Sequence, residues 1–399
     1  MSTTDNNKFI EIDPTGDLII KVVEYDLEAF GQDGNHPVLK TASFKVSRQT
    51  LLANCDSAVF KAMLSGAFKE GRESVVTLHE DSVASVELWL RRFYDAFNED
   101  SYEIPIVEVW NAIGFGRKYL FHGEKLNAWF MTYISKQKAM GFSKEDLMEW
   151  LYPCEAFSHP VGFAYITKML AHEGTGHIQE RNPSRYRDLH VEGRVIQQLN
   201  AARGSMRKEI VKGLFNPLNR ICDRECAVHE KSIKSYLNAI RRTGVWPVED
   251  IQHKSNKDII ESAGFVNWIA AKPENACISC LSSLSGAHVL KIRQAILTYW
   301  EGLCLDCMDI SKPRTGSIDN DYWTHNDTRN YDRGCRIRHK RNTWYFSFMG
   351  RAEIMDAFKH EQQARKKAKI ERERKEFEAA QESSESDSSD SKGGETTTA

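Results

Sequence analysis

The fold of the first third is decided by Phe44-Lys45-Val46-Ser47-Arg48, followed by Ser57-Ala58-Val59-Phe60-Lys61-Ala62-Met63-Leu64 and by Phe68-Lys69-Glu70. The first piece begins with alternating apolar and polar residues, which predicts a short strand. The residues after it predict two short helices, and the third piece predicts a charged turn. A strand, helices and a turn in this order indicate a mixed α+β unit.

Apolar patterns on both sides extend this unit. Residues 18–23 and 75–78 are rich in branched apolar residues and predict two more strands. Val86, Trp89 and Phe93 fall on one face of a predicted helix. Similar spacing predicts helices from Ile106 onward and from Glu124 to Lys136. We therefore expect three strands and several helices within the first third.

Composition limits the class of protein. The chain has 399 residues, 41% of them hydrophobic, and a formal net charge of -2. This length allows two or three domains, and the charge provides no global basic field for nucleic acid. We find neither a signal peptide nor an apolar run that could span a bilayer. We expect an intracellular protein of the cytoplasm, the nucleus or both, with no membrane contact.

Shifts in composition divide the chain into six predicted segments. The last of them is mostly Ser, Asp, Glu, Gly and Thr and cannot bury a core. The segments are a disordered lead at 1–15, the α+β domain at 16–136, a helical region at 141–215, a Cys/His-rich module at 220–350, a charged helix at 351–380 and a disordered acidic tail at 381–399.

The order of these motifs over residues 16–136 resembles a BTB/POZ domain, a fold that pairs proteins and carries no chemistry. Asp17 and Arg48 match the family's pair of charges near the dimer seam, while Ser47 stands where the family usually has His. The resemblance implies protein partners and a homodimer. The alternative for this pair is an ordinary turn cap and a solvated base.

Phe68 and Glu70 match the hydrophobic-x-Glu pattern by which many BTB proteins contact a cullin scaffold of ubiquitin ligases. The resemblance thus implies a possible cullin partner. The alternative is that Phe68 packs locally and Glu70 is a solvated charge. Beyond residue 141 the chain is similar to a group of fungal BTB proteins with a long Cys-rich C-terminal region, which brings no known activity.

Two C-x2-C pairs, Cys277/Cys280 and Cys304/Cys307, predict a structural zinc site. Four thiolates at about 2.3 Å from one ion complete a tetrahedron and leave no open position. The predicted helix over residues 289–300 would bring the second pair back to the first. Four reduced core cysteines are the alternative.

A second group, Cys222, Cys226 and His229, holds three further potential ligands. Cys335 or His339 could supply the fourth. An exchange of ligands between the two groups remains open from the sequence alone. Cys55 and Cys154 stand apart and predict core thiols.

Two basic segments could serve other functions. Residues 329–351 combine basic and aromatic residues, as nucleic-acid binding requires, but a strand beside a solvated loop fits the neutral whole-chain charge better. Residues 365–369 could form a nuclear import signal or a plain solvated helix face. Nucleic acid is therefore not the partner we expect.

None of the common catalytic motifs for phosphate, dinucleotide, serine-hydrolase or zincin chemistry occurs in the sequence. We predict that the protein is not an enzyme. We expect a scaffold that self-associates through its BTB domain and presents a zinc-shaped partner surface. A cullin adaptor and a nuclear regulator that contacts nucleic acid are the alternatives.

Overall fold

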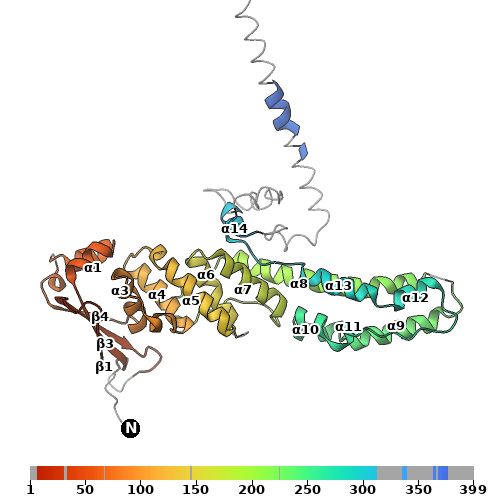
Figure 1. Cartoon of the computed structure of the whole chain (residues 1–399), viewed down its shortest axis with the longest axis horizontal. Coiled ribbons are helices and arrows are strands. Elements are labelled where there is room, and N and C mark those ends of the chain that lie inside the picture. Colours follow the sequence, from red (N-terminus) through yellow and green to blue (C-terminus); the bar gives the residue numbers. More distant parts are fainter. Residues whose placement is uncertain are drawn as a thin grey trace, which may run out of the picture.

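The chain begins with a mixed four-stranded sheet at one end of an elongated molecule (Figure 1). The strand order is β1-β3-β2-β4, in which β2 and β3 are antiparallel and each edge strand is parallel to its neighbour. The strands are β1 (Asn7–Glu11), β2 (Leu18–Tyr25), β3 (Val38–Val46) and β4 (Val75–His79). The computed structural model describes residues 7–30, 34–66, 68–143, 146–223, 225–311, 335–338, 363–364 and 367–375.

Strand β1 corrects two predictions. It lies inside residues 1–15, which we expected to be disordered, and it adds a fourth strand to the expected three. Its register sets Ile10 opposite Phe44, and both side chains are buried in the core. Because β1 pairs in parallel with β3 alone, it forms one edge of the sheet.

The two faces of the sheet differ. Alternate residues of β2 and β3 point inward, so Ile20, Val22 and Phe44 are buried beneath the helices. On the opposite face Phe9, with 58% of its surface exposed, and Leu39 are open to solvent. The sheet therefore has one packed face and one outer face that carries exposed apolar residues.

Serine N-caps fix where several helices over the inner face begin. The side chains of Ser47, Ser57 and Ser82 each accept an amide N–H three residues on. The two short helices expected after the β3 motif are confirmed. The helices of this part are α1 (Arg48–Asn54), α2 (Ala58–Leu64), α3 (Val83–Phe93), α4 (Ile106–Lys118) and α5 (Asn127–Met140), with short 3-10 helices at Lys69–Gly71, Glu99–Tyr102 and Gly123–Leu126.

The hydrophobic core continues without a break into the helical region expected at 141–215. The Trp110 indole donates to the Glu149 carbonyl at 2.8 Å. Tyr133 stacks on Trp150 with 5.5 Å between ring centroids. These contacts join α4 and α5 to the next elements, which are the 3-10 helix Asp146–Trp150, α6 (Leu151–Ala156) and α7 (Pro160–Glu173).

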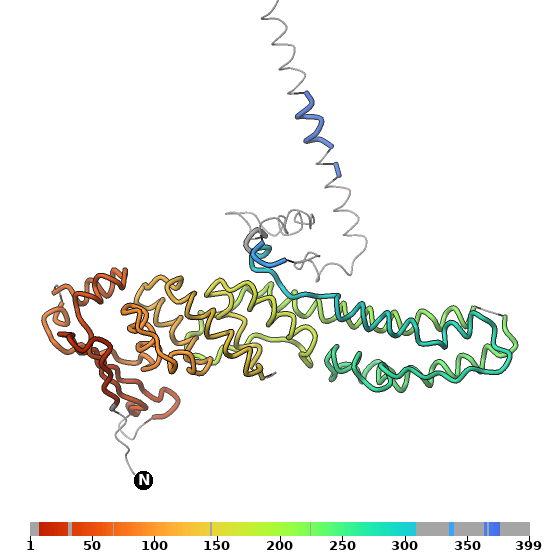
Figure 2. Tube along the Cα trace, viewed as in Figure 1, coloured from red at the N-terminus to blue at the C-terminus, as the bar shows by residue number. Residues whose placement is uncertain are grey.

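The long helix α8 (Gly193–Cys222) leaves this body and forms the spine of an extension (Figure 2). Its 30 residues correspond to about 45 Å. It contacts α7, α9, α10, α12 and α13. The remaining elements are α9 (His229–Thr243), the 3-10 helix Val248–His253, α10 (Asn256–Glu261), α11 (Ala263–Val266), α12 (Ile278–Leu284), α13 (Ala287–Leu297) and α14 (Leu305–Ser311).

Most of the predicted charged helix at 351–380 lies outside the described residues, as do the acidic tail at 381–399, most of 329–351 and part of 365–369. Residues 367–375 are helical, and Lys375 pairs with Glu371 one turn away at 3.9 Å. Within the described ranges, no helix is both long and apolar enough to cross a membrane.

A buried guanidinium interrupts the apolar packing of α8. Arg203 is only 5% exposed, and its Nε and Nη2 have no hydrogen-bond partner in the part of the chain that the structure describes. Arg207, one turn further on, donates to the Lys254 carbonyl but supplies no negative charge. Burial, and then the neighbouring Arg207, lower the pKa of Arg203 to about 10. Folding thus places a positive charge in a site that does not compensate it.

We predict that Arg203→Met raises the free energy of unfolding by about 1 kcal/mol or more, because methionine keeps the apolar stem and removes the buried charge. Denaturant unfolding measures the change. Arg241→Met, at an exposed site on α9, serves as the control and should change little. A destabilised Arg203→Met protein would contradict the prediction.

Candidate metal centres

The structure gathers six of the nine cysteines into two separate clusters of sulfur atoms. The distal cluster consists of Cys226, Cys277 and Cys280, and the proximal cluster of Cys304, Cys307 and Cys335. Within each cluster the sulfur atoms lie within 4.8 Å of one another. Each cluster is therefore compatible with a metal site.

Both C-x2-C pairs occupy the same positions at the start of a short helix. Cys277 is the N-cap of α12, and its carbonyl accepts the Leu281 amide at 3.0 Å. Cys304 immediately precedes α14, and its carbonyl accepts the Met308 amide at 3.1 Å. The second cysteine follows three residues later in each case. One helical turn thus brings the two sulfurs of each pair onto the same side.

The third cysteine of each cluster comes from elsewhere in the sequence. Cys226 lies in the turn between α8 and α9, where its carbonyl accepts the His229 amide at 2.9 Å. Cys335 belongs to the described segment 335–338. Each cluster therefore joins segments that are distant along the chain.

An arginine holds the segment that carries Cys335. The Arg336 amide and Nε donate to the Asp306 carboxylate at 2.6 and 2.9 Å, and Asp306 lies between the two cysteines of the pair on α14. Nη1 of Arg336 also donates to the Ser158 carbonyl at 3.0 Å. These charge-assisted hydrogen bonds position Cys335 beside α14.

The spacing of the sulfur atoms suits a tetrahedral ion. Cys307 and Cys335 are 3.7 Å apart. Zinc–sulfur bonds of about 2.3 Å in a tetrahedron place sulfurs about 3.8 Å apart, whereas a disulfide needs about 2.05 Å. The Cys307–Cys335 pair thus has the separation of metal ligands and not that of a disulfide.

The surroundings of the cysteines shift their pKa values in opposite directions. Backbone N–H groups at the start of α12 lower the pKa of Cys277, while burial raises the pKa of Cys280 to about 11. Burial and then Cys304 raise the pKa of Cys335 to about 11, and a hydrogen bond to Cys304 followed by burial raises that of Cys307. Several thiolates cannot share such a site unless a cation balances them.

The predicted four-cysteine site is wrong in its grouping. Helix α12, which begins directly after Cys277, lies toward the far end of the extension, whereas α14, which begins directly after Cys304, lies beside α7 (Figure 1). The reason is the direction of α13, whose 11 residues span about 16 Å and carry the chain away from the first pair. The alternative in which the two predicted groups exchange ligands describes the structure better. Cys226 joins Cys277 and Cys280, and Cys335 joins Cys304 and Cys307.

Cys222 and His229, which we predicted as ligands with Cys226, are outside both clusters. Cys222 is exposed at the end of α8. His229 begins α9, and its Nδ1 lies 2.9 Å from the Cys226 carbonyl. Because a carbonyl only accepts, Nδ1 carries the proton and Nε2 is the nitrogen left for other contacts. His339, the other predicted candidate, lies outside the described residues.

The two isolated cysteines, Cys55 and Cys154, are buried in the core as expected. Burial raises the pKa of Cys154 above its usual range. Both residues are therefore inert packing thiols.

The residues matched to the BTB pattern have specific contacts. Asp17 accepts the Arg48 backbone amide at 2.8 Å, so it acts as a cap and not as an ion-pair partner of the guanidinium. The Arg48 guanidinium instead donates to the carbonyls of Leu64 at 2.9 Å and Glu70 at 3.3 Å. Phe68, which lies between Leu64 and Glu70 in the sequence, is 57% exposed. Arg48 thus holds the turn that presents Phe68.

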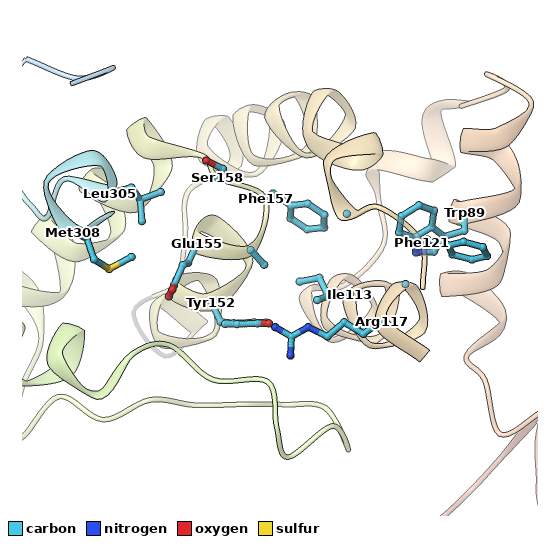
Figure 3. Close-up of a pocket in the computed structure, with 13 residues that line it drawn as sticks. Trp89, Ile113, Arg117, Phe121, Tyr152, Glu155, Phe157, Ser158, Leu305 and Met308 are labelled. Carbon is cyan, nitrogen blue, oxygen red and sulfur yellow. The ribbon is translucent and has the colours of Figure 1, made fainter. Parts of the chain in front are cut away.

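A pocket of about 330 Å³ lies where α3, α4, the α6–α7 turn and α14 meet (Figure 3). Sequence analysis did not identify it, because its walls come from segments far apart in the chain. Its side-chain walls include Trp89, Ile113, Arg117, Phe121, Tyr152, Glu155, Phe157, Ser158, Leu305 and Met308.

Comparison with known proteins gives no family assignment: no family model matches the sequence, and a search of curated proteins finds no match. The resemblance to BTB/POZ proteins therefore stays a prediction. The functional interpretation depends on the geometry of the sites.

Proposed function

We propose that the protein is an interaction scaffold, in which a BTB-type N-terminal domain self-associates and two structural zinc sites shape the C-terminal half for protein partners. The observation that carries this proposal is the position of the distal cluster. It ties the α8–α9 turn to the start of α12 at the tip of the extension. Ile278, between two of its cysteines, is 86% exposed. A metal-fixed tip with an exposed apolar side chain suits recognition of another protein.

Zinc is the metal that best fits three clustered cysteine sulfurs, because thiolate-rich sites favour zinc over calcium or magnesium. A structural site needs a fourth ligand. Cys222 and His229 flank Cys226 in the sequence and are the candidates for the distal cluster. His229 would bind through Nε2, while its Nδ1–H donates to the Cys226 carbonyl.

We predict two equivalents of zinc in the purified protein, measured by elemental analysis. Cys277→Ser should lower the content to about one equivalent, and so should Cys304→Ser, because each removes a ligand of a different cluster. Cys154→Ser, at a buried thiol outside both clusters, is the matched control and should keep both ions. Complete loss of zinc in Cys277→Ser would instead support one site shared by both pairs.

The outer face of the sheet supports self-association. Phe9 and Leu39 are exposed there, and β1 pairs with Thr41–Lys45 only, so Val38 and Leu39 extend beyond the edge strand. An apolar face beside a partly uncovered strand edge is the kind of surface that a second copy of the chain covers.

We predict a homodimer that Phe9→Asp converts to monomer, because a carboxylate on this face would lose hydration on association. Sedimentation velocity measures the change. Ile269→Asp, an equally drastic change at an exposed apolar site in the extension, should leave the dimer intact. A wild-type protein that is monomeric at all concentrations would contradict self-association through this domain.

The exposure of Phe68 favours a second candidate function, a substrate adaptor of a cullin-type ubiquitin ligase. The Arg48 guanidinium donates to the carbonyls of Leu64 and Glu70, which flank Phe68 in the sequence, and 57% of Phe68 is exposed. In this candidate the exposed ring would contact the cullin, and the zinc-fixed tip would hold the substrate.

If the adaptor function holds, a cullin co-purifies with the wild-type protein, and Phe68→Ala with Glu70→Ala abolishes its recovery. The reason is that the exposed ring supplies apolar contact area at the centre of the interface. The melting temperature should stay unchanged, which separates loss of binding from unfolding. Equal recovery from both proteins, or none from wild type, would eliminate this candidate.

A further inference from the structure

We propose that the pocket between α3, α4, α6 and α14 binds a small aromatic monocarboxylate. Its volume of about 330 Å³ is within the range of about 300–1,000 Å³ for small-molecule sites. It lies between the α+β part and the helical part of the chain, a position where ligand sites are common.

The walls of the pocket are suited to a flat apolar body. Trp89, Phe121 and Phe157 line it on one side, and Leu305 and Met308 of α14 close the other end (Figure 3). The Trp89 N–H already donates to the Ala112 carbonyl at 2.8 Å, so the indole offers the pocket only its ring. Aromatic and thioether walls of this kind favour an aromatic ligand.

The hydroxyl of Tyr152, in the wall of the pocket, lacks a hydrogen-bond partner in the described part of the chain. Tyr152 is 4% exposed, and among the described residues no group forms a hydrogen bond with its hydroxyl. Burial raises the pKa of Tyr152, so the hydroxyl remains a donor at neutral pH. A buried donor without an acceptor is costly, and a ligand oxygen would satisfy it.

Arg117 supplies the positive charge beside this donor. Its guanidinium carbon lies 5.8 Å from the centroid of the Tyr152 ring, and Figure 3 shows the two side chains with their polar ends directed toward each other. Arg117 also meets Asp188 at 3.4 Å, but 55% and 72% of these side chains are exposed, so the pair is weak and screened by water. A ligand carboxylate that reaches both Arg117 and Tyr152 can take the place of Asp188.

Glu155 limits the ligand to one negative charge. Its side chain also lines the pocket, on the other side of Tyr152 from Arg117 in Figure 3. A second carboxylate at that end would meet a like charge in a partly dry site. The carboxylate end of the ligand would therefore lie at Arg117, with its ring against Phe157 and Phe121.

The test uses the full-length protein with 3-phenylpropanoate as the probe and its neutral amide, 3-phenylpropanamide, as the matched compound. Calorimetric titration should show saturable binding of the acid and at least about tenfold weaker binding of the amide. Arg117→Gln and Tyr152→Phe should each weaken binding of the acid about tenfold, while Arg241→Gln, at an exposed arginine on α9, should bind like wild type.

Thermal melting of each variant shows whether it is folded, and Tyr152→Phe keeps the ring that packs against Trp110 at 4.9 Å. Three results would overturn the proposal: no saturable binding of the acid by wild type at millimolar concentrations, equal affinity for acid and amide, or unchanged affinity in the folded Tyr152→Phe variant.

Discussion

The C-terminal half of the structure depends on one electrostatic constraint: three cysteine sulfurs share a small space at the start of each of two short helices. In the distal cluster, the backbone N–H groups at the start of α12 stabilise the thiolate of Cys277, because they lower its pKa. Burial and neighbouring sulfurs act against the others and raise the pKa of Cys280 and Cys335. A divalent cation would reverse this balance, because every thiolate would then face a positive charge.

This constraint explains how a thin extension can have a defined tip. The hydrophobic cluster inside the extension is small, with Tyr236, Ile240 and Leu284 among its buried members, and Cys280 belongs to it. Cys280 belongs both to this packing and to the distal cluster, so a metal bound there would join the two sources of stability. At the other end of α13, Arg336 and Asp306 position Cys335, so the proximal cluster is arranged by hydrogen bonds even before a metal is considered.

The parts of the fold that local sequence determines were predictable. Local residue patterns and the spacing of apolar residues predicted the helices that became α1 to α5, because these signals lie within a few turns of each helix. Strand β1 was missed because it is an edge strand whose burial depends on the partner β3, and only Ile10 of it is buried. The grouping of the cysteines could not be predicted either. Spacing defines a C-x2-C pair, but the path of α13 and the turn at Cys226 decide which cysteine joins each pair.

Helix α14 connects the proximal cysteine cluster with the pocket. Its first turn begins with the proximal cysteine pair, and on the same helix Leu305 and Met308 form a wall of the pocket beside Trp89 and Phe157. Arg336, which holds Cys335, also donates to Ser158 of the pocket rim. Helix α14 has only 7 residues, but Leu305, Cys307 and Met308 are buried in the main hydrophobic core, so packing fixes its position together with the hydrogen bonds of Asp306. The proximal cluster and the pocket therefore share one short helix, so a shift of α14 would change the geometry of both.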